Sequence, residues 1–330
     1  MTSPALSETD FIARVEKAKA AVLSGETLSR ETIFSLKAAP LNALCEAAKA
    51  ITEALSPRAF NFCSIINAKS GGCSEDCHWC NQSGCYNTKA PITPLVGPTT
   101  ALTSAKKAEN LGIPRFSLVT VGRKLNRREI KEAGDVLDFL KDNTELELCA
   151  SMGLLNVEDL RHLKEHGLVR YHCNLETGPA FFPKVCTTHT FEDKVKTLKA
   201  AKSLGIELCS GGLFGMGETL EDRLEMGLVL QSLEVPSVPM NFLIPIESTP
   251  LAKQEPLPED EVLRTIALFR LMLPKAYLRF AGGRLLFSES LAQRAMEIGI
   301  NSEIVGELLT TGGTSVAQER QLAQKAGYHA

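Results

Sequence analysis

The sequence has almost no net charge, because 36 lysines and arginines face 39 aspartates and glutamates, which leaves a formal charge of −3 at pH 7. This balance gives no indication of a nucleic-acid partner. No apolar run is long enough to cross a bilayer, and the N-terminus lacks the basic-then-apolar pattern of a targeting signal. These absences predict a cytoplasmic protein without a membrane partner.

Cysteine is not scarce, since the 330 residues include 10 of them. A cytoplasmic chain does not normally build a disulfide framework, so metal binding is the better interpretation. Hydrophobic residues make up 44% of the chain, which is enough for a large packed core. The cysteines are therefore the first candidates for functional residues.

Three cysteines, Cys73, Cys77 and Cys80, form a C-x3-C-x2-C run directly after Gly71 and Gly72. Thiolates are soft ligands that select zinc, copper(I) or iron–sulfur clusters, and a structural zinc site would need a fourth ligand. Three thiolates suit a 4Fe–4S cluster whose fourth iron stays open for a substrate. One face of a helix would also gather these thiols, but the preceding glycines and the polar residues of the run favour a loop.

From residue 60 onward, the pattern alternates between expected strands and expected helices. The expected strands are Phe60–Asn67, Arg115–Val121, Leu146–Met152, Val169–Glu176, Glu207–Phe214, Val238–Pro245, Ala276–Gly282 and Ser302–Gly306. The helices expected between them include Thr99–Leu111, Arg127–Asp142, Val157–His166, Phe191–Leu204, Leu220–Leu233 and Asp260–Met272. Eight such units predict an α/β protein, a (β/α)8 TIM-type barrel with its chemistry at the C-terminal ends of the strands.

Three divisions of the chain follow from this pattern. Residues 1–58 are expected to form an N-terminal helical extension that closes the bottom of the barrel. Residues 59–315 are expected to form the barrel itself. Residues 316–330 are expected to be a C-terminal tail, and the polar segment Gln318–Ala330 is expected to fray.

Another set of cysteines is dispersed over the expected strands. Cys63 lies in the first strand, Cys149 in the third and Cys209 in the fifth. Because alternate strands of a barrel contribute side chains to the same interior layer, these three thiols could converge inside it.

The segment from Ser64 to Ser83, SIINAKSGGCSEDCHWCNQS, resembles the cluster loop of the biotin synthase family, within the radical S-adenosylmethionine superfamily. The resemblance extends from about Phe60 to Thr311. It implies a 4Fe–4S cluster on Cys73, Cys77 and Cys80, whose open iron binds S-adenosylmethionine and whose electron releases a 5′-deoxyadenosyl radical.

The family inserts sulfur from an auxiliary iron–sulfur cluster into dethiobiotin, which gives biotin. The resemblance therefore also implies dethiobiotin as substrate, a flavodoxin or ferredoxin as electron donor, and a homodimer. Two other interpretations remain: a related radical enzyme resembling hydrogenase maturases, or a non-catalytic iron–sulfur carrier.

The auxiliary ligands of the family are three cysteines and an arginine. Cys149, Cys209 and Arg279 match three of these positions, and Cys209 is accordingly predicted to take part in catalysis. Ser117 stands where the family usually has the third cysteine, and a hydroxyl is a poor ligand for a soft metal. The usual 2Fe–2S ligation is thereby in doubt.

Extra cysteines suggest a rearranged auxiliary cluster, either 2Fe–2S or larger. The hypothesis assigns it to Cys63, Cys149, Cys186 and Cys209, with Arg279 as a further ligand or a nearby donor. Cys173 is the alternative to Cys186 as the fourth ligand. The competing interpretation is that Cys63, Cys173 and Cys186 are only small buried apolar residues.

The resemblance also assigns cofactor and substrate contacts. Asn174 and Glu176 are predicted to bind the ribose or the ureido group, and Asn241 the cyclic urea, which its amide can pair with on both sides. Substrate contact is also predicted for Arg279. Lys194 falls where the family has an arginine facing the methionine carboxylate, with a solvated helix charge as the alternative.

Glycines and one tryptophan complete the predicted cofactor site. Gly211 and Gly212 are predicted to let the backbone approach the adenosyl group. Trp79 is predicted to shield the cluster or stack on adenine, unless it only packs. His172 and His189 are expected to be surface or locally hydrogen-bonded residues, and Cys85 a loop thiol without a role.

Overall fold

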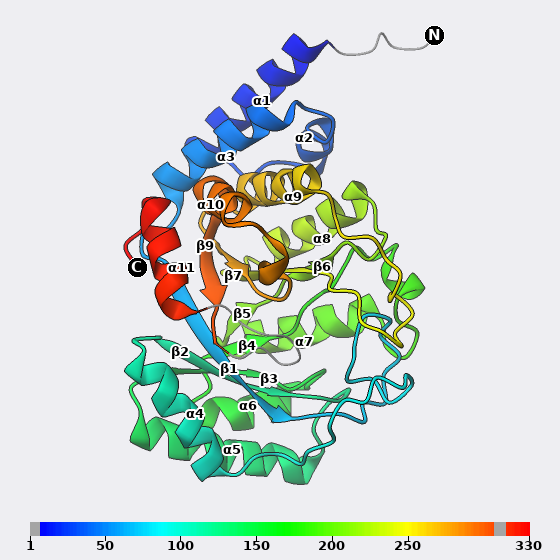
Figure 1. Cartoon of the computed structure of the whole chain (residues 1–330), viewed down its shortest axis with the longest axis vertical. Coiled ribbons are helices and arrows are strands. Elements are labelled where there is room, and N and C mark those ends of the chain that lie inside the picture. Colours follow the sequence, from blue (N-terminus) through cyan, green and yellow to red (C-terminus); the bar gives the residue numbers. More distant parts are fainter. Residues whose placement is uncertain (1–6, 307–314) are drawn as a thin grey trace.

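Parallel strands form a closed barrel in the computed structural model, which describes residues 7–306 and 315–330 (Figure 1). The strands of these described residues are β1 (Asn61–Lys69), β2 (Arg115–Thr120), β3 (Glu147–Ser151), β4 (Arg170–His172), β5 (Glu207–Cys209), β6 (Gly212–Phe214), β7 (Ser237–Phe242), β8 (Tyr277–Phe280) and β9 (Ile300–Ile304). The sheet order is β5-β4-β3-β2-β1-β9-β8-β7-β6, and a β5–β7 pairing closes it.

Strands β5 and β6 together fill one position of the barrel. Cys209 pairs with Ser237 of β7, and Gly212 pairs with Met240, three residues further along β7. The strand expected over Glu207–Phe214 is therefore real but interrupted. The eight strand positions confirm the predicted (β/α)8 TIM-type fold.

Gly211 explains the interruption. A Cβ at this position would lie 1.9 Å from the carbonyl oxygen of Pro239 on β7, so no other residue fits without moving backbone. The two chains thus approach each other more closely than two side-chain-bearing strands can.

Helices surround the barrel between the strands. They are α1 (Glu8–Leu23), α2 (Arg30–Ser35), α3 (Leu41–Leu55), α4 (Pro98–Asn110), α5 (Arg127–Asn143), α6 (Val157–Glu165), α7 (Phe191–Ser203), α8 (Leu220–Ser232), α9 (Glu259–Met272), α10 (Glu289–Ile298) and α11 (Val316–Lys325), with short 3-10 turns at Phe182–Lys184 and Arg284–Leu286. The six inter-strand helices expected from the sequence are all present, each within a residue of its expected start.

The N-terminal helices cover one end of the barrel. In Figure 1, α1 and α3 lie across α9 and α10, and α3 packs directly on both. Leu44, Ala48 and Ile51 are fully buried at helical spacing, and burying a side chain such as Leu44 stabilises by about 1.5–3 kcal/mol. The hydroxyl of Thr52 donates to the carbonyl of Ile298, just before β9 begins, so this end holds the strand N-termini.

The C-terminal segment does not fray, so that expectation is wrong. Residues Val316–Lys325 form α11, which packs on α10 and buries Leu322 and Ala323. Glu319 is buried too, and its carboxylate pairs with Arg284 at 2.9 Å. A single apolar face and one buried ion pair thus hold a segment whose overall composition is polar.

Candidate active site

A cavity of about 350 Å³ opens inside the barrel, and both sets of predicted cysteines contribute to its lining. Its polar and thiol-bearing walls come from the cluster loop and from most strands of the barrel. The lining residues that matter here are Cys63, Trp79, Cys80, Ser117, Cys149, Arg170, His172, Asn174, Glu176, Cys209, Asn241 and Arg279.

The cluster loop has no α-helical structure between Cys73 and Cys80, so the helix-face alternative is wrong. The amide of Cys73 donates to the carbonyl of Gln82 at 3.0 Å, and the amide of Gly84 donates back to Cys73 at 2.7 Å. Gly71 has a φ of +70°, and a Cβ there would lie 2.5 Å from Pro91 O. The loop therefore depends on glycine to fold back on itself and bring Cys80 to the cavity.

The three cysteines of this loop are half-buried, and their sulfurs are not all within 4.8 Å of one another. A single metal ion would need closer sulfurs, because two ligands on one tetrahedral ion lie less than about 4 Å apart. The wider set of soft donors fits a cluster with several irons. Cys73, Cys77 and Cys80 thus fit the predicted 4Fe–4S group, and their roles as its ligands remain a prediction.

Cys63, Cys149 and Cys209 all line the cavity, from β1, β3 and β5, as the alternate-strand argument expects. The part of the cavity that these three thiols line is called the floor. All three are buried, and burial raises the pKa of the Cys149 thiol to about 12. Burial also raises the pKa of Cys63, with the charge of Arg279 opposing it. A group that gathers thiols out of water in this way fits a soft-metal cluster, although ligation itself remains a prediction.

Arg279 reaches this floor from β8. Its guanidinium donates to the carbonyls of Asn61 and Glu303 at 3.2 and 3.1 Å, and to the side-chain oxygen of Asn61 at 2.7 Å. Burial lowers the pKa of Arg279, and the nearby Cys63 and Cys209 oppose that shift.

Ser117 lies level with Cys149, because the two residues are register partners on β2 and β3. It is buried and lines the cavity. The residue that replaces the usual family cysteine thus stands beside one of the remaining thiols.

A second guanidinium on the floor was missed by the sequence reasoning. Arg170 of β4 is buried, pairs in register with Cys149 and donates to Glu207 at 2.8 and 3.0 Å. The available signal was alternation, since a strand that presents Asn174 to the interior presents Arg170 and His172 there as well.

The same alternation shows that Cys173 is wrong as an alternative ligand. Arg170, His172 and Asn174 face the cavity, whereas Tyr171 and Cys173 belong to the hydrophobic core on the outer side of β4. A residue between two inward-facing neighbours must point outward.

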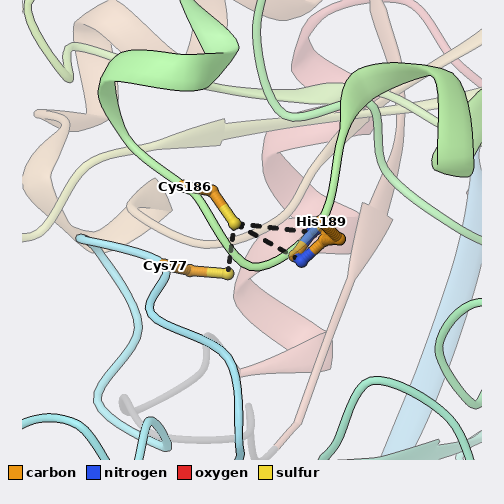
Figure 2. A group of neighbouring side chains, drawn as sticks. All are labelled: Cys77, Cys186 and His189. Carbon is orange, nitrogen blue, oxygen red and sulfur yellow. Dashed lines mark hydrogen bonds between the residues drawn. The ribbon is translucent and has the colours of Figure 1, made fainter.

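The expected place of Cys186 beside the floor thiols is also wrong. Cys186 does not line the cavity, and its sulfur lies 3.7 Å from the sulfur of Cys77 (Figure 2). The physical reason is a contact between two loops. The carboxylate of Asp76 accepts hydrogen bonds from the amides of Thr187 and Thr188 at 2.9 and 3.2 Å, which holds the loop after β4 against the cluster loop.

His189 is buried and contacts Cys186 three residues earlier, so of its two expected environments the local hydrogen bonding is confirmed and the surface position is wrong. Its Nδ1 lies 3.4 Å from the Cys186 sulfur and 2.7 Å from a carboxylate oxygen of Glu75. A hydrogen bond with Cys77 and others with His189 lower the pKa of Cys186 to about 4, against the effect of burial. The Cys186-x2-His189 spacing was the missed signal in the sequence.

His172 makes local hydrogen bonds, as expected, but it does so in the cavity wall. Its ring nitrogens lie 3.0 Å from the Ser151 hydroxyl and 2.9 Å from the side-chain oxygen of Asn174. Burial lowers the pKa of His172 to about 4, so the ring is neutral near pH 7. The Asn174 oxygen also accepts from the amide of Gly211 at 3.0 Å, which fixes the amide plane.

Glu176 and Lys194 form a buried pair, with 3.8 Å between the ammonium and the carboxylate. The solvated-charge alternative for Lys194 is therefore wrong. Burial raises the pKa of Glu176, and the charge of Lys194 opposes that rise. Glu176 has a φ of +72°, and its carbonyl accepts from the amide of Leu213, so the strained backbone is held by β6.

Asn241 lines the opposite wall from β7. Its amide nitrogen donates to the carbonyl of Gly212 at 3.0 Å, and its oxygen accepts from the amide of Gly282 at 2.9 Å. One N–H and one lone pair remain for a ligand. Trp79 packs beside Phe181 and Met216 at the rim and also lines the cavity.

No helix in residues 7–306 or 315–330 combines the length and apolarity that a membrane span requires. The large apolar core predicted from the composition is present, and it is continuous from the N-terminal helices through the barrel to α11.

Comparison with known proteins agrees with this geometry. The model of the radical SAM superfamily matches residues 68–228, and that of the biotin and thiamin synthesis associated domain matches residues 239–329. The structure of the FeFe-hydrogenase maturase of Carboxydothermus hydrogenoformans superposes with a TM-score of 0.80 at 16% identity, covering 98% of this chain and 85% of that one. Methylornithine synthase superposes with a TM-score of 0.74 at 16% identity, covering 94% and 96%. At this identity, these likenesses concern the fold.

Fold and cluster loop together define a radical S-adenosylmethionine enzyme. Among curated proteins, the biotin synthase of Porphyromonas gingivalis is 45% identical over 92% of either chain, and one from Clostridium botulinum is 42% identical over 96% of this chain and 99% of its own. The chain belongs to the biotin synthase family.

Proposed function

We propose that this chain converts dethiobiotin to biotin by inserting sulfur between two carbons that are not otherwise activated. The observation that carries the proposal is that one cavity is lined both by Cys80 of the cluster loop and by Cys63, Cys149 and Cys209 of the strands. A substrate held between them would face a radical source on one side and a sulfur source on the other.

Cys73, Cys77 and Cys80 would hold the 4Fe–4S cluster. When bound, this cluster supplies the electron that cleaves S-adenosylmethionine, which provides the radical for hydrogen abstraction. The protein's part is to bind, orient and exclude water. Trp79 lines the cavity beside the cluster loop. Gly211 and Gly212 would contact the adenosyl group through backbone atoms only, because the space that a Cβ on either would need is filled by Pro239 and Met226.

Asn174, Glu176 and Asn241 would bind the ribose and the ureido group. The oxygen of Asn174 is already oriented by His172 and Gly211, so little ordering remains when a ligand binds. Lys194 would face the methionine carboxylate of the cofactor, and its ammonium also lies 3.8 Å from the Glu176 carboxylate.

Cys63, Cys149 and Cys209 would hold an auxiliary iron–sulfur cluster, either 2Fe–2S or larger, that donates the sulfur. Arg279 would be its fourth ligand or a hydrogen-bond donor to it, and would also contact substrate. Support comes from the burial of all three thiols and from two guanidiniums, Arg279 and Arg170, that would offset the charge of an anionic cluster.

The two competing functions account for fewer of these residues. A relative resembling hydrogenase maturases leaves the floor thiols Cys149 and Cys209 without a purpose. A cluster carrier leaves the polar walls of Asn174 and Asn241 without one.

The remaining partners are proposed on family grounds: a flavodoxin or ferredoxin as electron donor, a homodimer, and a cytoplasmic location. The division into an N-terminal extension (1–58), a catalytic barrel (59–315) and a C-terminal segment (316–330) is proposed likewise.

The test is a product assay under anaerobic conditions. Reconstituted protein receives dethiobiotin, S-adenosylmethionine and a reductant, and mass spectrometry measures biotin and 5′-deoxyadenosine. We expect both products. Formation of 5′-deoxyadenosine without biotin would contradict the proposed substrate while keeping the radical chemistry.

A further inference from the structure

Three side chains of metal-ligating types gather where the cluster loop meets the loop after β4, and none of them lines the cavity. The Cys77 sulfur, the Cys186 sulfur and the ring of His189 lie within 4.8 Å of one another, and in the described part of the chain this is the single group of its kind (Figure 2). Cys77 comes from the cluster loop, and the other two come from the loop after β4. Neither Cys186 nor His189 has a part in the proposed sulfur insertion.

The distances are those of ligands around one ion. Zinc–sulfur bonds of about 2.3 Å and zinc–nitrogen bonds of about 2.0–2.1 Å at tetrahedral angles place two sulfurs about 3.8 Å apart, and a sulfur and a nitrogen about 3.6 Å apart. Here the two sulfurs are 3.7 Å apart. The Cys186 sulfur lies 3.4 Å from Nδ1 and 3.8 Å from Nε2 of His189.

A second, independent observation is the carboxylate behind the histidine. Glu75 is buried, and its Oε2 lies 2.7 Å from Nδ1 of His189. This carboxylate accepts a hydrogen bond from Nδ1–H, which keeps the proton on Nδ1 and leaves the lone pair on Nε2, the arrangement usual for metal-binding histidines. The Ser74 hydroxyl, at 2.8 Å from the other oxygen of Glu75, holds the carboxylate in turn.

We propose that the cluster-free chain binds one divalent cation of the Zn²⁺ or Fe²⁺ class through Cys77, Cys186 and Nε2 of His189. Both sulfurs bind the ion as thiolates, any proton still on them passes to water, and the fourth position of the ion stays open to water. Because Cys77 is also a predicted cluster ligand, the ion and the 4Fe–4S cluster exclude each other. A chain that has not received its cluster would therefore hold a single ion in its place.

Cys73 and Cys80 have no part in this site, and that separates it from the three-cysteine loop. Their sulfurs do not join the group around Cys186. The hydrogen bonds from Thr187 and Thr188 to Asp76 hold the two loops against each other and so keep Cys186 beside Cys77.

The experiment is a Co²⁺ titration of the full-length, cluster-free protein under anaerobic conditions, with Zn²⁺ as competitor. Sulfur-to-cobalt charge-transfer absorption reports thiolate ligation directly. We expect Cys186→Ser and His189→Gln to weaken Co²⁺ binding by more than the roughly 10- to 100-fold that loss of an outer partner causes, and Glu75→Gln to weaken it within that range. Circular dichroism checks that each variant is folded.

The matched controls are Cys73→Ser, in the same loop, and Cys173→Ser, a buried thiol that faces the core. Both should bind Co²⁺ like the parent chain. Absence of thiolate absorption in the parent, or absorption that survives Cys186→Ser but is lost in Cys73→Ser, would overturn the proposal, because the ion would then sit on the three-cysteine loop or nowhere. None of these readings depends on biotin formation.

Discussion

The cluster loop and the floor of the cavity are both rich in thiols, but they are built in opposite ways. Cys73, Cys77 and Cys80 lie within one short loop that glycines fold back on itself. Cys63, Cys149 and Cys209 lie on three different strands and meet only because the barrel closes. A local motif can therefore be read from spacing, whereas a dispersed site can be read only through the topology.

The first way to sharpen this comparison is to remove the loop site alone. Cys80→Ala should reduce 5′-deoxyadenosine formation to background, because a cubane held by two thiolates lacks its third anchor. Iron on the floor should remain, and counting iron and sulfide per chain measures it. Cys85→Ala, an exposed thiol nearby, should behave like the parent. Parental 5′-deoxyadenosine formation by Cys80→Ala would contradict the assignment of the loop.

The second change removes the floor site alone. Cys149→Ala should leave 5′-deoxyadenosine formation nearly intact but lower biotin by more than the roughly 10- to 100-fold typical of an outer metal partner. Cys173→Ala is the matched control, because it deletes a buried thiol on the outward side of the neighbouring strand. Equal biotin yields from the two variants, measured by mass spectrometry, would show that the floor thiols do not hold the sulfur source.

A third experiment tests whether the floor can be rebuilt. Cys63→Ala should lose auxiliary iron, and adding Ser117→Cys should restore part of it, since Ser117 lies level with Cys149 on the adjoining strand. Electron paramagnetic resonance of the reduced protein measures the recovery. Full auxiliary iron in Cys63→Ala would remove Cys63 from the ligand set, and Cys45→Ala, a buried thiol in α3, controls for the loss of a buried sulfur.

The smallest effect concerns the wall between the two regions. The pKa of His172 is lowered to about 4 in the folded chain. As the pH falls, this histidine is therefore protonated near pH 6.5 in the unfolded chain but only near pH 4 in the folded chain. Stability should therefore fall as the pH drops from about 6.5 to about 4, by roughly 2–3 kcal/mol from this residue. His172→Asn should flatten that part of the unfolding free-energy curve in urea, and His329→Asn, exposed near the C-terminus, should not.

Most of the fold was predictable because it rests on periodicity. All eight expected strands exist, and the alternation of strand and helix is enough to predict the barrel. Two features were not predictable in this way. The break between β5 and β6 comes from one close approach of Gly211 to β7. The ion pair of Arg284 with Glu319, which helps to hold α11, joins residues 35 positions apart and so leaves no local sequence pattern.

The candidate site likewise has predictable and unpredictable parts. The loop cysteines and the convergence of Cys63, Cys149 and Cys209 followed from spacing and strand order. Cys186 was misplaced because loop paths depend on contacts such as those of Asp76, far away in the sequence. The predictions for Cys173 and Arg170 failed for a different reason. Strict alternation along β4 places Cys173 on the outward side and Arg170 on the inward side.

The distance in sequence between the floor thiols also bears on how the chain folds. We expect contacts between residue 63 and residue 209 to form late, because the loop between them must close before the contact can stabilise anything. A newly made chain would therefore offer the three-cysteine loop to iron well before it offered the floor. The order in which the two metal groups can be loaded would then depend on the folding kinetics. Quenched exchange of backbone amides measures those kinetics.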